Sequence, residues 1–103
     1  MRLGCHVAFG GAATFNRSDD IREAAALCPA NLILSETDSP YMAPVPLRGQ
    51  ECEPAMVGIT AARVAEVRAQ AGVAPAADTC EALWSNACDL FGLHVAAPSD
   101  IAR

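Results

Sequence analysis

The hydrophobic positions of this chain predict two short strands separated by a helix. Residues 5–9 and 32–35 are brief, mostly apolar runs, a pattern typical of buried strands. Between them the apolar residues recur at helical spacing, after a polar start at Ser18 and before a stop at Pro29. This order, with a connection of this length, favours a right-handed parallel crossover.

Two further helices are predicted after a proline-punctuated loop. The loop runs from Thr37 to Glu53, which is long for a strand-to-helix connection and is typical of a functional loop. Pro54 suits the first turn of the next helix, and Gly72 suits its end. Asp78, followed by Glu81, predicts a capping box that opens the last helix. The apolar side of that helix is expected in the core: Cys80, Leu83, Trp84, Ala87 and Phe91.

The ends of both predicted strands carry the residues of greatest chemical interest. Gly10 and Gly11 follow the first strand and indicate backbone that turns sharply or passes close to another segment. Glu36 and Asp38 follow the second strand, where a buried parallel strand delivers a carboxylate to a site at its C-terminal end. Asp38 is the leading candidate site residue, although Asp before Ser-Pro is also common in turns.

The predicted sheet is incomplete by itself. Two parallel strands do not form a sheet that can bury both faces, so a chain with this pattern needs more strands beside it. We therefore expect these 103 residues to be a fragment of a larger α/β fold.

Composition narrows the class of protein. The chain is 52% hydrophobic, but its apolar runs are far shorter than the roughly 20 residues of a membrane span, and no apolar signal segment opens it. We expect a cytoplasmic protein without membrane contact, in which the five cysteines, an odd number, are free thiols. A net charge of −5 argues against non-specific electrostatic binding of nucleic acid, but it does not argue against a phosphate site built on metal cations.

Several motifs, taken together, resemble one family. The chain is similar to the C-terminal part of the TatD family of metal-dependent deoxyribonucleases, and the resemblance covers about His6 to Leu93. It rests on Phe9-x-Gly11-x-x-Thr14-Phe15, on Glu36-Thr37-Asp38-Ser39-Pro40-Tyr41 with Ala43-Pro44, Arg48-Gly49 and Glu53-Pro54 after it, and on Asn86-x-x-x-Leu90-Phe91-Gly92.

The resemblance implies a TIM-type (β/α)8 barrel, of which this chain would be the last quarter, in the order β-α-β-α-α. Residues 1–93 would form the C-terminal part of the barrel, and residues 94–103 a flexible polar tail. A complete barrel needs roughly 250 residues. The chain is thus expected to be incomplete as a standalone fold.

The resemblance also implies a site that binds divalent metal ions, with Mg, Mn and Zn as candidates. Asp38 matches the family's last-strand aspartate, which sits at the metal centre and helps to orient or deprotonate the attacking water. The family's other ligands, an H-x-H pair, a Glu and two further His, have no counterpart here, so the ligand set is incomplete. Glu36 would be an acid at the barrel mouth or a partner of Arg48. Arg48 would contact substrate phosphate or anchor its loop to a carboxylate.

The loop departs from the family pattern H-R-G-K-R-N-E-P. Here Leu47–Pro54 lacks one histidine and two basic residues of that pattern and has the acidic Glu51 instead. These changes should weaken the binding of phosphate by the loop. Metal-dependent hydrolysis is therefore better supported than DNA as the substrate.

Three functional hypotheses follow. In the first, the chain is part of a metal-dependent hydrolase of phosphodiester bonds, a deoxyribonuclease by resemblance, and is inactive when isolated. In the second, it is a non-catalytic or degraded domain that folds by self-association or by docking to the missing N-terminal part of the barrel. In the third and weakest, it belongs to a related barrel hydrolase with another substrate.

Overall fold

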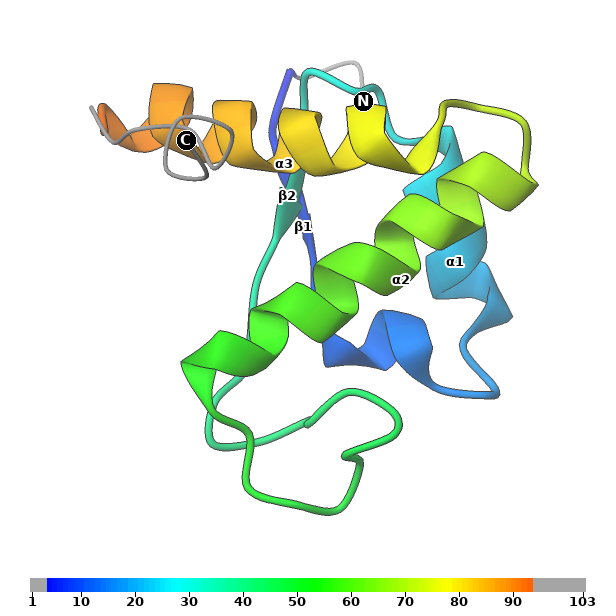
Figure 1. The fold of residues 1–103 in the computed structure, drawn as a ribbon, viewed down its shortest axis with the longest axis vertical. Coiled ribbons are helices and arrows are strands. Elements are labelled where there is room, and N and C mark those ends of the chain that lie inside the picture. The colour runs from blue at the N-terminus through cyan, green and yellow to red at the C-terminus, as the bar shows by residue number, and fades with distance from the viewer. Residues whose placement is uncertain (1–3, 94–103) are drawn as a thin grey trace.

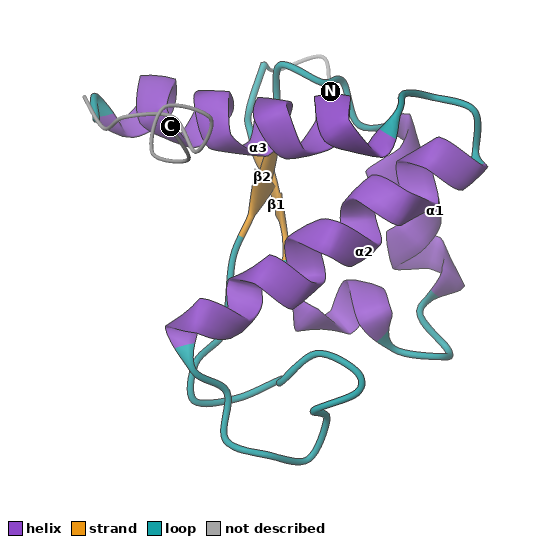
Figure 2. Ribbon diagram, viewed as in Figure 1, coloured by secondary structure: helices purple, strands orange, loops and turns teal. Residues whose placement is uncertain are grey.

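The chain follows the predicted order of strand, helix, strand, helix, helix over residues 4–93, the part that this computed structural model describes (Figures 1 and 2). The predicted tail, 94–103, lies outside the described residues. The regular elements are β1 (Val7–Phe9), α1 (Asp19–Leu27), β2 (Ile33–Ser35), α2 (Val57–Gln70) and α3 (Ala76–Phe91), with two short 3-10 turns, η1 (Gly11–Thr14) and η2 (Pro54–Met56).

The two strands pair in parallel, as the crossover predicts. Val7 lies beside Ile33, and Phe9 beside Ser35. The ladder extends past both ends of β2, because the Val7 amide donates to the Leu32 carbonyl at 2.8 Å and the Glu36 amide donates to the Phe9 carbonyl at 3.0 Å. Both strands therefore leave the sheet at the same end, where Gly10 and Gly11 lie near Glu36 and Asp38.

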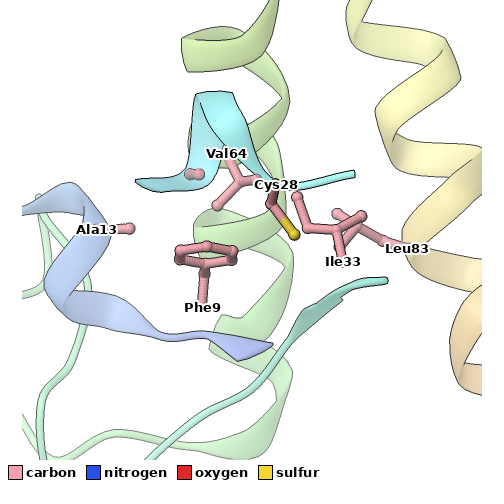
Figure 3. Close-up of a cluster of buried hydrophobic side chains, with 7 residues drawn as sticks. Phe9, Ala13, Cys28, Ile33, Val64 and Leu83 are labelled. Atoms are coloured by element: carbon pink, nitrogen blue, oxygen red, sulfur yellow. The ribbon is translucent and has the colours of Figure 1, made fainter. Parts of the chain in front are cut away.

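All three helices contribute to one core on one face of this sheet. Phe9 and Ile33 point from the strands toward the helices, where Cys28, Val64 and Leu83 meet them (Figure 3). Ala8, which points to the opposite face because side chains alternate along a strand, is exposed. Within the described part of the chain, the helical layer thus covers one face of the sheet.

A buried arginine joins the three helices. Arg68 of α2 is 2% exposed. Its guanidinium donates to the carbonyls of Ala25 and Cys28 at 2.9 and 2.6 Å, at the end of α1, and to the Thr79 hydroxyl of α3 at 3.2 Å. A cation at a helix C-terminus satisfies carbonyls that the helix leaves unpaired.

Burial raises the pKa of the Cys28 thiol, and the positive charge of Arg68 opposes that rise. Cys28 is therefore a neutral core residue.

The start and the exposed side of α3 differ from the prediction. The helix begins at Ala76, after Pro75, so Asp78 lies inside its first turn and the expected capping box is wrong. Phe91, expected in the core, is 67% exposed. Asn86 has a clear structural role instead, because its amide donates to the carbonyls of Ala30 at 2.7 Å and Ile33 at 2.9 Å and so covers part of the outer edge of β2.

Candidate functional site

Glu36 and Asp38 follow β2 directly, at the end where the strand leaves the sheet. Both side chains are exposed, and neither makes a hydrogen bond or ion pair with another described residue. They line a pocket of about 440 Å³ together with Asp20 from the first turn of α1. The pocket therefore has acidic groups from two elements and lies where both strands end.

The glycine pair after β1 brings the backbone close to the second strand's loop. A Cβ on Gly10 would lie 1.9 Å from Oε1 of Glu36, and a Cβ on Gly11 would lie 2.1 Å from the carbonyl oxygen of Met42. The clash at Gly11 is with backbone, which cannot swing aside as a side chain can. The close approach that the glycine pair predicts is confirmed, and it determines how near the acids lie to β1.

Thr14 fastens the two loops to each other. Its buried hydroxyl donates to the Gly11 carbonyl at 2.6 Å and accepts a hydrogen bond from the Val45 amide at 2.8 Å. The bond to Val45 spans 31 residues of sequence. The conformation of the pocket rim thus depends on a single hydroxyl group that both accepts and donates.

Arg22 holds the turn that follows β1. Its guanidinium donates to the carbonyl oxygens of Ala13 and Asn16 at 3.2 and 3.1 Å, and also to that of Phe15. An ion pair with Asp19 at 2.6 Å completes its bonding. Helix α1 therefore positions the turn that follows β1.

The loop around Asp38 is closed by a tight turn. The Tyr41 amide donates to the Asp38 carbonyl at 2.7 Å, and the two residues form an isolated antiparallel bridge. Ser39 donates its hydroxyl to that of Thr37 at 3.0 Å. Ser39 also contacts the Cys52 sulfur at 3.6 Å, so Thr37 and Ser39 bond to protein groups, while the Asp38 side chain between them is exposed.

Arg48 lies over the ring of Phe15, with its guanidinium carbon 3.9 Å from the ring centroid. Such a cation–π contact holds the guanidinium without using its N–H donors. No ion pair joins Arg48 to Glu36 or to any other described carboxylate. Of the alternatives open from sequence, the Glu36–Arg48 pair is absent from the described structure.

The acids in this pocket do not complete a metal site. Among residues 4–93, no group of three or more His, Cys, Asp and Glu side chains is placed to hold a metal ion. Asp38 can therefore contribute a ligand to a divalent cation, but the described residues do not supply a full coordination shell, which for Mg²⁺ or Ca²⁺ has at least about six oxygens.

Comparison with known proteins decides the family. The sequence pattern of the family described as "TatD related DNase" matches residues 1–92. The chain belongs to this family. This TatD-family chain is 49% identical over 57 residues to the uncharacterized metal-dependent hydrolase YcfH of Escherichia coli K12, a match that covers 55% of the chain and 22% of YcfH.

A more distant relative extends the match. An uncharacterized metal-dependent hydrolase of Mycoplasma pneumoniae is 36% identical over 89 residues, which is 86% of the chain and 33% of the relative. The crystal structure of YjjV, a TatD homologue from E. coli K12, superimposes with a TM-score of 0.76 at 31% identity, over 88% of the chain and 34% of YjjV. The TatD-family chain thus has a TatD-like α/β fold and spans about a third or less of these relatives.

Two residues of the site region lay outside the sequence prediction. Asp20 suits the positive end of the α1 dipole by its position in the first turn, and it also lines the acidic pocket. Tyr41 belongs to the family motif, but the sequence predicts no role for it, although the residue is 68% exposed.

Among the described residues, no helix is long and apolar enough to cross a membrane.

Proposed function

We propose that this chain is the C-terminal quarter of a TatD-type (β/α)8 barrel that hydrolyses phosphodiester bonds, with DNA as the favoured substrate. The observation that carries this proposal is the position of Asp38, which lies directly beyond the C-terminal end of a parallel strand in a chain of the TatD family. Active sites of (β/α)8 barrels lie at that end of the strands.

In the complete barrel, Asp38 would be one ligand of the divalent metal centre. The relatives' names as metal-dependent hydrolases support the presence of such a centre. A bound divalent cation supplies Lewis-acid polarisation of a phosphoryl oxygen. Other strands of the barrel would supply the remaining ligands, and the 103-residue chain alone should be inactive.

A chimera tests the role of this chain in catalysis. The C-terminal third of E. coli YcfH is replaced by residues 1–92 of this chain, and cleavage of DNA and of bis(p-nitrophenyl) phosphate is measured with Mg²⁺, Mn²⁺ or Zn²⁺ beside the parent. The chimera should cleave the substrate that YcfH cleaves, and Asp38→Asn should reduce the rate by about 10²- to 10⁴-fold. Glu23→Gln, an exposed acid on α1, is the matched control and should leave the rate unchanged.

Two results would count against the proposal. A folded chimera that stays inactive while YcfH cleaves would show that this segment cannot complete the site. Clear metal-dependent turnover by the isolated chain, lost on Asp38→Ala, would overturn the claim that the chain alone is inert.

A further inference from the structure

The position of Asp38 depends on the turn that carries it, because its own side chain makes no hydrogen bond or ion pair with another described residue. This Asp38 turn, residues 37–41, is closed internally by the Tyr41 amide, which donates to the Asp38 carbonyl at 2.7 Å. A group in a metal site has to be held within about 0.5 Å of its working position. The bonds that fix the Asp38 turn to the rest of the fold therefore determine where its carboxylate lies.

Within residues 4–93, both hydrogen bonds that leave the Asp38 turn go to one residue, Cys52. The Cys52 amide donates to the Pro40 carbonyl at 2.9 Å, and the Cys52 sulfur lies 3.6 Å from the Ser39 hydroxyl. The thiol also donates to the Glu53 carbonyl at 3.7 Å, directly before η2 and α2. Cys52 thus joins the Asp38 turn to the start of a helix.

The contact between Ser39 and Cys52 is shielded from water. Cys52 is 3% exposed, although Glu51 and Glu53 on either side of it are exposed. Hydrogen bonds to sulfur are weak individually, but at a buried position water does not compete for them. Ser39 and Cys52 are 13 residues apart, so this contact closes the loop between them at its base.

We propose that Cys52 is a positioning residue for Asp38, and that its thiol holds the Asp38 turn against the start of α2. This rests on the proposed function, in which Asp38 is one metal ligand. Helix α2 is itself fixed to α1 and α3 through Arg68. The helical layer therefore positions the carboxylate, and loss of the thiol loosens the turn without unfolding the chain, because the backbone bond to Pro40 remains.

Amide hydrogen exchange in the full 103-residue chain, followed by NMR without metal, tests this role. The Tyr41 amide, bonded to the Asp38 carbonyl, reports on the turn, and the Val7 amide, bonded to the Leu32 carbonyl, reports on the sheet. In Cys52→Ala, Tyr41 exchange should accelerate about threefold to tenfold, while Val7 exchange changes less than about twofold. Cys52→Ser restores a hydrogen-bonding group and should keep Tyr41 exchange within about twofold of the parent.

Matched variants separate positioning from general destabilisation. Cys28 is also a buried thiol, 2% exposed, that donates to the carbonyl of the next residue at 3.6 Å. It packs in the hydrophobic core, so Cys28→Ala should accelerate Val7 exchange and leave Tyr41 exchange unchanged. Adding Cys52→Ala to Ser39→Ala should accelerate Tyr41 exchange less than about twofold further, because both changes remove the same contact. Dispersed spectra confirm that each variant is folded.

The YcfH chimera gives a second measurement, the metal concentration that supports half of the maximal rate. Cys52→Ala should raise this concentration about threefold to tenfold, because the carboxylate of Asp38 is held less firmly. Cys52→Ser should restore the parent value. Cys28→Ala should lower the melting temperature of the chimera without changing its metal requirement.

Three results would each overturn the proposal: equal acceleration of Tyr41 and Val7 exchange in Cys52→Ala, equal effects of Cys52→Ala and Cys28→Ala on Tyr41, or an unchanged metal requirement in an active chimera. Because exchange is measured without metal or cleavage, its result is independent of the proposed function. Selective exchange at Tyr41 beside an inactive chimera would remove the proposed function alone, and uniform exchange beside an active chimera would remove the positioning role alone.

Discussion

Thr14 and Thr60 are both buried threonines, but only Thr14 has its hydroxyl bonded. Thr14 links Gly11 to Val45, whereas the Thr60 hydroxyl has no partner among the described residues. Thr14→Val should lower the free energy of unfolding by about 1–3 kcal/mol, because it leaves two backbone groups without their partner. Thr60→Val should leave it unchanged or raise it by up to about 1 kcal/mol, because an unpaired buried hydroxyl is replaced by a methyl.

Urea unfolding of the two variants and the parent measures this difference. Each substitution exchanges the same groups, so the two variants control for one another. Equal destabilisation by Thr14→Val and Thr60→Val would show that the bridge between the loops contributes nothing.

At single residues, sequence reasoning was most successful where chemistry restricts the choice. Gly11 was predicted to meet another segment, and it does, because the Met42 carbonyl occupies the space of a Cβ. The exposed position of Asp38 follows from the strand that precedes it. The partners were not predictable, since Arg48 could reach a phosphate, a carboxylate or a ring, and the side chain stacks on Phe15. Only the folded loop brings those two residues together.

Arg68 and Arg63 lie on the same helix and should differ in importance. Arg68→Met should lower the free energy of unfolding by about 3 kcal/mol, because charged hydrogen bonds to the end of α1 are lost and its carbonyls stay buried. Arg63 is partly exposed and pairs with Glu66 at 2.9 Å. Arg63→Met should cost no more than about 0.5 kcal/mol, the usual value of a surface pair.

Thermal and urea unfolding, followed by circular dichroism at 222 nm, checks both values. Arg68→Lys should recover only part of the loss, because an ammonium cannot reproduce the guanidinium's bonds to Ala25, Cys28 and Thr79. If Arg68→Met is as mild as Arg63→Met, the three helices do not depend on this side chain.

Among the elements, order and type could be predicted, but the helix starts and exposed faces could not. The two parallel strands and α1 follow from the spacing of apolar residues and from the helix-breaking residues between them. Gly72 and Gly92 mark the ends of α2 and α3. The predicted start of α3 at Asp78 is too late, because the helix begins at Ala76 and its N-cap, Pro75, makes no side-chain cap. The burial of Arg68 could not be predicted from sequence, because it depends on carbonyls about 40 residues away.

For the whole molecule, the one-sided sheet predicts self-association. Helices cover the face of Phe9 and Ile33, while Ala8 on the opposite face is exposed. Such a sheet, isolated from further strands, should bury its open face and edge against another copy. Light scattering after size exclusion, at about 10–200 µM, should give masses that rise with concentration above the 10.7 kDa of one chain.

A pair of variants locates the contact. Ala8→Asp, on the open face, should shift the species toward monomer, whereas Leu27→Asp, at a residue 74% exposed on α1, should not. A monomer of constant mass with cooperative unfolding would mean that the described fold is sufficient by itself.

Met42 lines both the acidic pocket beside Asp38 and a second pocket that Tyr41 and Arg48 line, so the two pockets share a boundary at this residue. The residue has a φ of 59°, unusual for a side chain other than glycine, and its carbonyl rests on Gly11. A ligand that moves Met42 in one pocket changes the free energy of binding in the other. Linkage then requires reciprocity: the factor by which a ligand in the Asp38 pocket changes the affinity of the second pocket equals the factor by which a ligand in the second pocket changes the affinity of the Asp38 pocket.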